Sequence, residues 1–184
     1  MKMLVRETKE SKVSIGARVA RATPKVSVQT GKPFFDHMLT TFGRYAGLDL
    51  TIQATGDLTH HLMEDVALTL GRALSTVVPS AAARYGERTI PMDDALVQVV
   101  IDLGGRPYFV GKLPSRLYTH VLRSLSDALS ANVHVRVLAG EDRHHITEAA
   151  FKALGLAFRQ AIQTSGEDGV FSTKGAVSFR EEEG

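Results

Sequence analysis

The sequence contains no cysteine among its 184 residues. This absence excludes a disulfide scaffold, a thiolate zinc site, an iron–sulfur cluster and a cysteine nucleophile. An excess of charge of one sign is also lacking, because 22 lysine and arginine residues stand against 20 aspartate and glutamate residues. Nothing in this balance favours nucleic acid or an anionic membrane as a partner. No apolar run reaches the roughly 18 residues of a membrane span, and no apolar targeting segment follows Met1. We therefore expect a cytoplasmic globular protein.

Histidine is the residue type that stands out. The pattern His-His-x-x-Glu occurs twice, beginning at His60 and at His144, and the two copies lie 84 positions apart. Two further histidines, His37 and His120, lie 83 positions apart in the segments that precede the two copies. Self-similarity at one long period indicates two copies of one structural unit rather than a solenoid.

The hydrophobic pattern supports a duplication. Each half shows alternating segments typical of strands and segments of helical period, in the order strands, helix, strand, helix. The predicted strands include 13–19, 48–54, 95–103, 106–112 and 133–137, and the predicted helices begin near Pro33, His60, Leu117 and Ile146. We expect an α+β fold of two half-domains, at 1–86 and 87–184, that pack together with their helices inside.

The repeated motif has the spacing of a metal site. The first histidine and the glutamate of each copy are four residues apart, so on a helix they share one face. Adjacent histidines point roughly 100° apart, so the two members of a pair fit two different ions better than one. Eight candidate ligands divided evenly give three histidines and one glutamate for each of two ions. Nitrogen and oxygen ligands suit Mn²⁺ best, with Fe²⁺, Co²⁺ and Zn²⁺ left open. The seventh histidine, His134, lies in a strand and has no equivalent, so we expect it to be structural.

A second group of residues is suited to an anion. Arg106 follows two glycines, Arg84 precedes Tyr85, and the segment 172–175 reads Ser-Thr-Lys-Gly. Arginine, lysine and hydroxyl groups are the expected ligands of a phosphate. The segment 172–175 is not a P-loop, because no Gly-x-x-x-x-Gly-Lys precedes it.

Six motifs stand in an order that resembles the imidazoleglycerol-phosphate dehydratase family of histidine biosynthesis. They are Phe35-Asp36-His37-Met38-Leu39, His60-His61-Leu62-Met63-Glu64-Asp65, Pro91-Met92-Asp93-Asp94-Ala95-Leu96, Arg106-Pro107-Tyr108, His144-His145-Ile146-Thr147-Glu148-Ala149 and Ser172-Thr173-Lys174-Gly175. Together with a similar opening motif from Arg6 to Glu10, the resemblance covers nearly the whole chain.

The resemblance implies a fold and an assembly. The fold is the ribosomal protein S5 domain 2-like arrangement, with a helical layer between two four-stranded sheets. The assembly is a homo-oligomer of trimers that form a shell of about twenty-four subunits, with active sites at subunit contacts. The resemblance further implies two Mn²⁺ ions per site and no organic cofactor. The implied metal ligands are His37, His60, His61, Glu64, His120, His144, His145 and Glu148.

The resemblance also assigns roles in a reaction. The phosphate-binding group is Arg84, Arg106, Ser172 and Lys174, and the catalytic group is Glu10, Lys152 and Asp93. The implied reaction dehydrates D-erythro-imidazoleglycerol phosphate to imidazoleacetol phosphate, with Glu10 as the acid and base and no redox step.

The sequence departs from the family pattern in three places. The segment 56–60 is shorter than in bacterial and plant members, Arg143 stands where an aspartate is usual, and Thr40-Thr41 replaces Asp-Gln. The first and third departures resemble the archaeal branch. Because these departures remove carboxylates that would orient the histidines, we expect backbone carbonyls or a neighbouring subunit to take that role.

Two other functions fit parts of the pattern. A di-metal hydrolase is one alternative, although the sequence lacks an aspartate-rich bridging motif. A non-enzymatic metal-binding shell is another, although it would leave the anion-binding group without a use. Incubation with imidazoleglycerol phosphate separates the three, because only the dehydratase forms the ketone without releasing phosphate.

Overall fold

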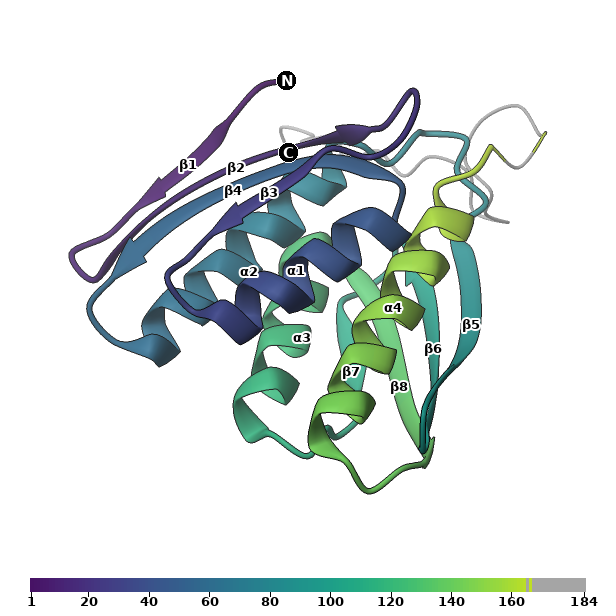
Figure 1. Ribbon diagram of the computed structural model, residues 1–184. Coiled ribbons are helices and arrows are strands. Elements are labelled where there is room, and N and C mark those ends of the chain that lie inside the picture. Colours follow the sequence, from purple (N-terminus) through teal and green to yellow (C-terminus); the bar gives the residue numbers. More distant parts are fainter. Residues whose placement is uncertain (165, 167–184) are drawn as a thin grey trace, which may run out of the picture.

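The computed structural model describes residues 1–164 and 166, which form two four-stranded sheets and four helices (Figure 1). The first sheet has the strand order β1-β2-β4-β3 and belongs with helices α1 and α2. The second has the order β5-β6-β8-β7 and belongs with α3 and α4. The elements are β1 (Leu4–Glu7), β2 (Ser11–Val19), β3 (Val26–Gln29), α1 (Pro33–Tyr45), β4 (Leu48–Gly56), α2 (Thr59–Ser75), β5 (Tyr85–Met92), β6 (Ala95–Leu103), β7 (Tyr108–Val110), α3 (Arg116–Leu129), β8 (Ala131–Ala139) and α4 (Arg143–Ala161).

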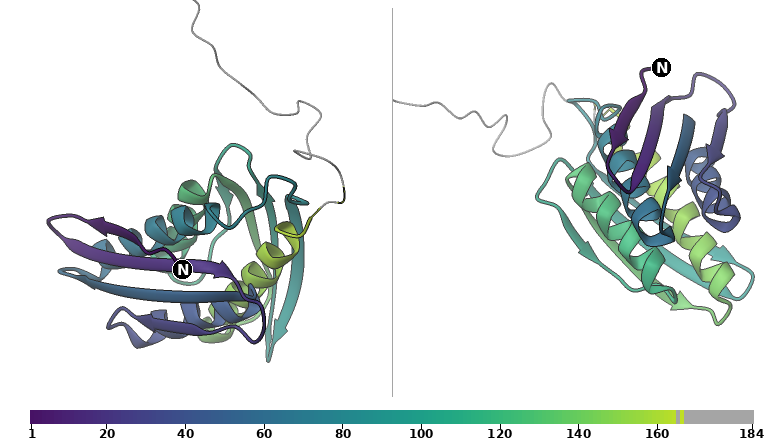
Figure 2. Two further views of the ribbon diagram at one scale, coloured as in Figure 1. Left: turned by 90° about the horizontal axis from the view of Figure 1, so that it is seen from above. Right: turned by 90° about the vertical axis from the view of Figure 1, so that its left-hand side faces the viewer.

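The two sheets repeat one topology. In each, the first two strands form an antiparallel hairpin, the strand before the first helix pairs parallel to the strand after it, and the last helix follows. Figures 1 and 2 show the helices as a layer with one sheet on either side. The α+β fold with a helical layer between two four-stranded sheets is therefore confirmed.

The core lies between the two sheets. Alternate residues of the central strands face the helices and are fully buried, as at Ile15 and Leu50 in the first sheet and Val97 and Val99 in the second. Full burial of one such side chain contributes about 1.5–3 kcal/mol. Because one continuous cluster of buried residues joins both sheets and all four helices, the helices are stabilised from both sides.

The helices pair across the two halves of the chain. Helix α2 packs on α3, and α1 packs on α4. The rings of Phe42 in α1 and Phe158 in α4 meet with centroids 6.2 Å apart. At Gly155 of α4 an added Cβ would lie 2.8 Å from the carbonyl oxygen of Phe42, and at Gly71 of α2 an added Cβ would lie 2.6 Å from the carbonyl oxygen of Leu125. Each helix pair therefore joins a helix of one half to a helix of the other at close range.

The strand predicted at 106–112 was too long. Only Tyr108–Val110 pairs, parallel to β8, as strand β7. Pro107 has no N–H to donate to a neighbouring strand, which is consistent with pairing that begins after it. Two strands, β1 and β5, were not identified from the sequence, although they form the outer strand of each hairpin.

Candidate functional site

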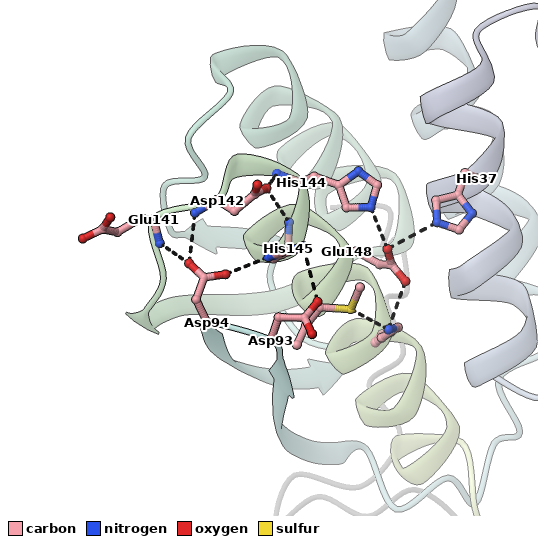
Figure 3. Close-up of polar contacts among 10 residues, drawn as sticks. His37, Asp93, Asp94, Glu141, Asp142, His144, His145 and Glu148 are labelled. Atoms are coloured by element: carbon pink, nitrogen blue, oxygen red, sulfur yellow. Dashed lines mark hydrogen bonds and ion pairs between the residues drawn. The ribbon is translucent and has the colours of Figure 1, made fainter.

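One group of candidate ligands lies where α1 meets α4, and we call it the α1–α4 cluster: His37, His144 and Glu148. Asp142 starts α4 by accepting hydrogen bonds from the backbone N–H groups of His144 and His145, at 2.7 and 3.2 Å. This cap sets His144 in the first helical turn. Nε2 of His144 and Nε2 of His37 then lie 3.0 and 3.3 Å from the same oxygen of Glu148 (Figure 3).

The second group lies where α2 meets α3, and we call it the α2–α3 cluster: His60, Glu64 and His120. Nε2 of His60 lies 3.6 Å from one carboxylate oxygen of Glu64, and Nε2 of His120 lies 3.3 Å from the other. The two imidazole rings are stacked with centroids 4.9 Å apart. The members of this cluster are the repeat equivalents of the α1–α4 cluster, so the duplication in the sequence appears in space as two like groups of ligands.

The second histidine of each pair points away from its own cluster. Nδ1 of His61 lies 3.1 Å from Asp57 and 3.4 Å from Glu10. Nδ1 of His145 lies 2.7 Å from Asp94, and its Nε2 lies 3.3 Å from Asp93. Within the described part of the chain, each cluster therefore holds two histidines and one glutamate.

Carboxylates of this same chain orient both outward histidines. The expectation that backbone carbonyls or a neighbouring subunit would orient them is therefore wrong for the Nδ1 atoms of His61 and His145. The short segment before His60 still carries Asp57, and its place in the turn lets one carboxylate accept from the Leu58 N–H and face His61. These bonds, with that of Leu58 the larger cause, hold the pKa of Asp57 below its usual value.

Charge around Glu148 favours its ionised form. Burial alone would raise its pKa, but hydrogen bonds from Lys152 and His37 outweigh burial and hold the pKa of Glu148 below its usual value. Nζ of Lys152 lies 2.9 Å from the carboxylate and 2.8 Å from Sδ of Met92. The predicted active-site lysine is thus a direct neighbour of the α1–α4 cluster.

The other two predicted catalytic residues sit at equivalent hairpin tips. Glu10 lies in the turn between β1 and β2, and Asp93 lies in the turn between β5 and β6 with a φ of 47°. Each faces the outward histidine of its own half, Glu10 at His61 and Asp93 at His145. The two tips therefore present one carboxylate each beside the two copies of the motif.

A network centred on the buried Asp65 fixes the tip that carries Glu10. Asp65 of α2 accepts hydrogen bonds from Nε of Arg6 at 2.8 Å and from the hydroxyl of Ser11 at 2.5 Å. Arg6 lies in β1 and Ser11 opens β2, so this carboxylate ties both sides of the turn to the helix that carries His60 and His61.

The predicted phosphate-binding arginines lie far from the α1–α4 cluster of the same subunit. The backbone N–H of Arg84 bonds to Ala161 at the carboxyl end of α4, whereas His144 lies at the amino end. Seventeen residues of helix separate the two ends by about 25 Å. Nε and Nη2 of Arg84 donate to Asp102, and Arg106 lies in the loop that follows β6 at this same end. The predicted Ser172 and Lys174 lie outside the described residues.

Both clusters fit a divalent cation. Each gathers two imidazole nitrogens and a carboxylate, with the ligand atoms within 4.8 Å of one another, and this set of donors suits Mn²⁺ and related ions. Nε2 of His120 is buried without a hydrogen-bond partner among the described residues, although Glu64 lies 3.3 Å away. A cation between the two would satisfy both groups.

Four functional candidates were missed from the sequence: Asp57, Asp65, Asp94 and Asp102. Asp57 and Asp65 flank the first histidine motif, so their positions offered a signal. Asp94 stands in the motif 91–96 beside Asp93, which offered a signal, although its contact with a histidine 51 positions away could not be read from the sequence. Asp102 offered no signal, because its arginine partner lies 18 positions away.

None of the helices described is long and apolar enough to cross a bilayer.

A family model described as imidazoleglycerol-phosphate dehydratase matches residues 30–158. The imidazoleglycerol-phosphate dehydratase of Acidothermus cellulolyticus is 43% identical over 94% of this chain and 90% of its own length. That of Methanococcoides burtonii is 42% identical over 95% and 97%.

Two solved structures share the fold. The crystal structure of the Pyrococcus furiosus enzyme, in complex with (S)-C348, is 40% identical with a TM-score of 0.83 and covers 95% of this chain and all of that one. The Staphylococcus aureus enzyme is 30% identical with a TM-score of 0.76, over 90% of this chain and all of that one.

Proposed function

The chain belongs to the imidazoleglycerol-phosphate dehydratase family, and on that premise we propose that it works as a di-manganese enzyme. The resemblance inferred from the six motifs is confirmed, and so is the prediction that the chain is a hydro-lyase of histidine biosynthesis. The observation that carries the proposal is the pair of equivalent clusters, each with two histidines and one glutamate within ligand distance.

We assign one ion to each cluster. His37, His144 and Glu148 hold the first, and His60, Glu64 and His120 hold the second. His61 and His145 face away from these clusters, so we assign them to ions held mainly by neighbouring subunits. This arrangement gives three histidines and one glutamate per ion and leaves positions for substrate.

The distance along α4 between the predicted phosphate-binding arginines and the candidate metal ligands supports a site made by more than one subunit. Arg84 and Arg106 lie about a helix length from the α1–α4 cluster of their own chain. We propose that they bind the phosphate of a substrate whose imidazole lies at the clusters of another subunit, together with Ser172 and Lys174. Trimers that assemble into a shell of about twenty-four subunits would bring such ends together.

The proposed reaction converts D-erythro-imidazoleglycerol phosphate to imidazoleacetol phosphate and water. Bound cations would supply positive charge that favours loss of a proton from the imidazole ring. Glu10 takes a proton from one carbon of the substrate's glycerol chain and returns a proton at a later step. We assign this role to Glu10 because its hairpin tip faces the candidate ligand His61. Hydroxide leaves from the neighbouring carbon, and the resulting enol rearranges to the ketone. Lys152 lies beside the α1–α4 cluster, and Asp93 lies beside His145. In these positions we propose that they stabilise charge that develops on the reacting groups.

Turnover by the metal-stripped enzyme tests the proposal. With imidazoleglycerol phosphate, the stripped chain should be inactive, and added Mn²⁺ should restore formation of imidazoleacetol phosphate without free phosphate. Release of phosphate would favour the hydrolase instead. Tight metal binding with neither product would favour a storage or sensing shell.

A further inference from the structure

Asp94 lies at the centre of a small polar network beside His145. One of its carboxylate oxygens accepts hydrogen bonds from the backbone N–H groups of Glu141 and Asp142, at 2.6 and 3.0 Å. The other oxygen lies 2.7 Å from Nδ1 of His145 (Figure 3). A single side chain from the β5–β6 turn therefore holds both the segment that enters α4 and one ring nitrogen of a candidate ligand.

The three contacts decide which nitrogen of His145 carries hydrogen. An aspartate carboxylate is ionised at neutral pH and can only accept, and one oxygen of Asp94 already accepts from two backbone N–H groups. Nδ1 of His145 must then be the donor in its bond to Asp94. With hydrogen on Nδ1, the lone pair that a metal ion needs is the one on Nε2, which faces away from Asp94 and lies 3.3 Å from Asp93.

The residue that caps α4 is not the residue that contacts the His145 ring. Asp142 accepts from the backbone N–H groups of His144 and His145 and so starts the helix, whereas Asp94 contacts the His145 ring itself. The side chain of Glu141 points away from Asp94 in Figure 3, and only its backbone N–H takes part. The helix cap is thus carried by the side chain of Asp142, whereas the turn contact and the ring contact are both carried by Asp94.

We propose that Asp94 is a positioning residue that fixes the ring and tautomer of His145 so that Nε2 is available to a metal ion. The inference rests on the proposed function, because it takes His145 as a ligand to an ion held mainly by a neighbouring subunit. A carboxylate on the second nitrogen of a ligating histidine orients the ring and raises its basicity, and its loss typically costs 10–100-fold in metal affinity.

The substitution Asp94→Asn tests the tautomer directly. The asparagine oxygen can still accept from the Glu141 and Asp142 N–H groups, so the turn is kept. Its amide NH₂ then faces Nδ1 of His145 and donates, which moves the hydrogen of the ring to Nε2. We expect Asp94→Asn to bind Mn²⁺ about 10–100-fold more weakly at half of the sites, and the visible absorption of Co²⁺-loaded chain to change with the loss of a nitrogen ligand.

Glu141→Gln is the matched control, because it removes one negative charge from the same turn without touching the ring. Its Mn²⁺ affinity and Co²⁺ spectrum should equal those of the wild type. If Asp94 acts through His145, the double variant Asp94→Asn with His145→Ala should bind Mn²⁺ no more weakly than His145→Ala alone. The metal-free thermal midpoint of each variant shows whether the chain still folds.

Wild-type affinity in Asp94→Asn, or a further loss in the double variant, would overturn the inference. The proposed function fails separately: a wild type that binds two Mn²⁺ ions per subunit but does not dehydrate the substrate contradicts the reaction and leaves the comparison of variants valid. A wild type that binds no Mn²⁺ overturns both.

Discussion

At the scale of single residues, Glu10 is the proposed acid and base of the reaction. It lies at a hairpin tip, 3.4 Å from Nδ1 of His61, and outside both clusters. We predict that Glu10→Gln reduces turnover by on the order of 10²–10⁴-fold, which is the usual contribution of a general acid or base. The Mn²⁺ content, measured by atomic absorption, should stay that of the wild type. Near-normal turnover would remove Glu10 from the reaction.

Tyr118 provides a prediction about pH. Burial, with a smaller effect of Asp36, raises the pKa of the Tyr118 hydroxyl to about 12. Because the unfolded chain ionises this tyrosine near its ordinary value, the contribution of the neutral hydroxyl to stability is fully present below that value and is lost as pH rises through the folded pKa. Absorption at the tyrosinate band should show one of the four tyrosines titrating late, and Tyr118→Phe should remove that step. A late step that survives in Tyr118→Phe would contradict the assignment.

The sequence predicts ligands better than it predicts what orients them. Equal spacing in two copies predicted that the first histidine and the glutamate of each motif lie together, because a helix converts a four-residue spacing into a shared face, and the structure brings them together. The outward direction of His61 and His145 follows from the same geometry only in part. Adjacent side chains must diverge, but their partners, such as Asp94 on a remote turn, depend on how the turn packs against the helix.

At the scale of elements, two glycines govern how closely the helices pair. Gly71 and Gly155 occupy equivalent positions, 84 residues apart, and each faces the backbone of the helix from the other half. An added methyl group would push α2 from α3, or α4 from α1, where the core is closely packed. We predict that Gly71→Ala and Gly155→Ala each lower the free energy of unfolding by about 1–3 kcal/mol, measured by chemical denaturation.

An exposed helix would respond to the same change in the opposite direction. Replacing glycine by alanine in a solvated helix interior stabilises it by about 1 kcal/mol. A neutral or stabilising effect at either glycine would therefore mean that the helices are less closely packed than the structure shows. The two variants also serve as controls for each other, since the repeat predicts losses of similar size.

The two strands that the sequence did not predict, β1 and β5, are those with the weakest alternation of apolar and polar residues. All four residues of β1 are exposed, so no alternation of apolar and polar residues reveals it. In β5 every second position is exposed, but the intervening residues include Gly86 and Arg88, which are not strand signals. Both strands form because a hairpin partner supplies the hydrogen bonds, which is information carried by pairing rather than by local sequence.

At the scale of the whole molecule, metal and assembly should depend on each other. His61 and His145 face outward from the clusters of their own chain, so we assign them to ions shared with neighbouring subunits. We predict that a chelator lowers the thermal midpoint and converts the largest assembly into smaller species, as measured by light scattering and gel filtration. Added Mn²⁺ should reverse both changes, and Mg²⁺ at the same concentration should not. An assembly unchanged by complete loss of metal would contradict shared ligands.

The overall architecture was predictable because the two halves repeat, so the order of strands and helices in one half supported the same order in the other. The boundary between 86 and 87 stays a prediction. The position of Arg84 at the opposite end of α4 from His144 was not predictable, because the sequence does not reveal which turns gather at which end of the layer. The same limit applies to any site completed by another subunit.

The fusion of two like units in one chain has a genetic consequence. In a symmetric homodimer a single mutation alters both metal sites at once, whereas here each site has its own codons. The two halves differ in how the outward histidine is held. The outward histidine of the first half takes its carboxylate from Asp57, four residues earlier in the chain, and that of the second half takes it from Asp94 on a distant turn. Selection can thus tune the affinity of one ion while the other is held constant.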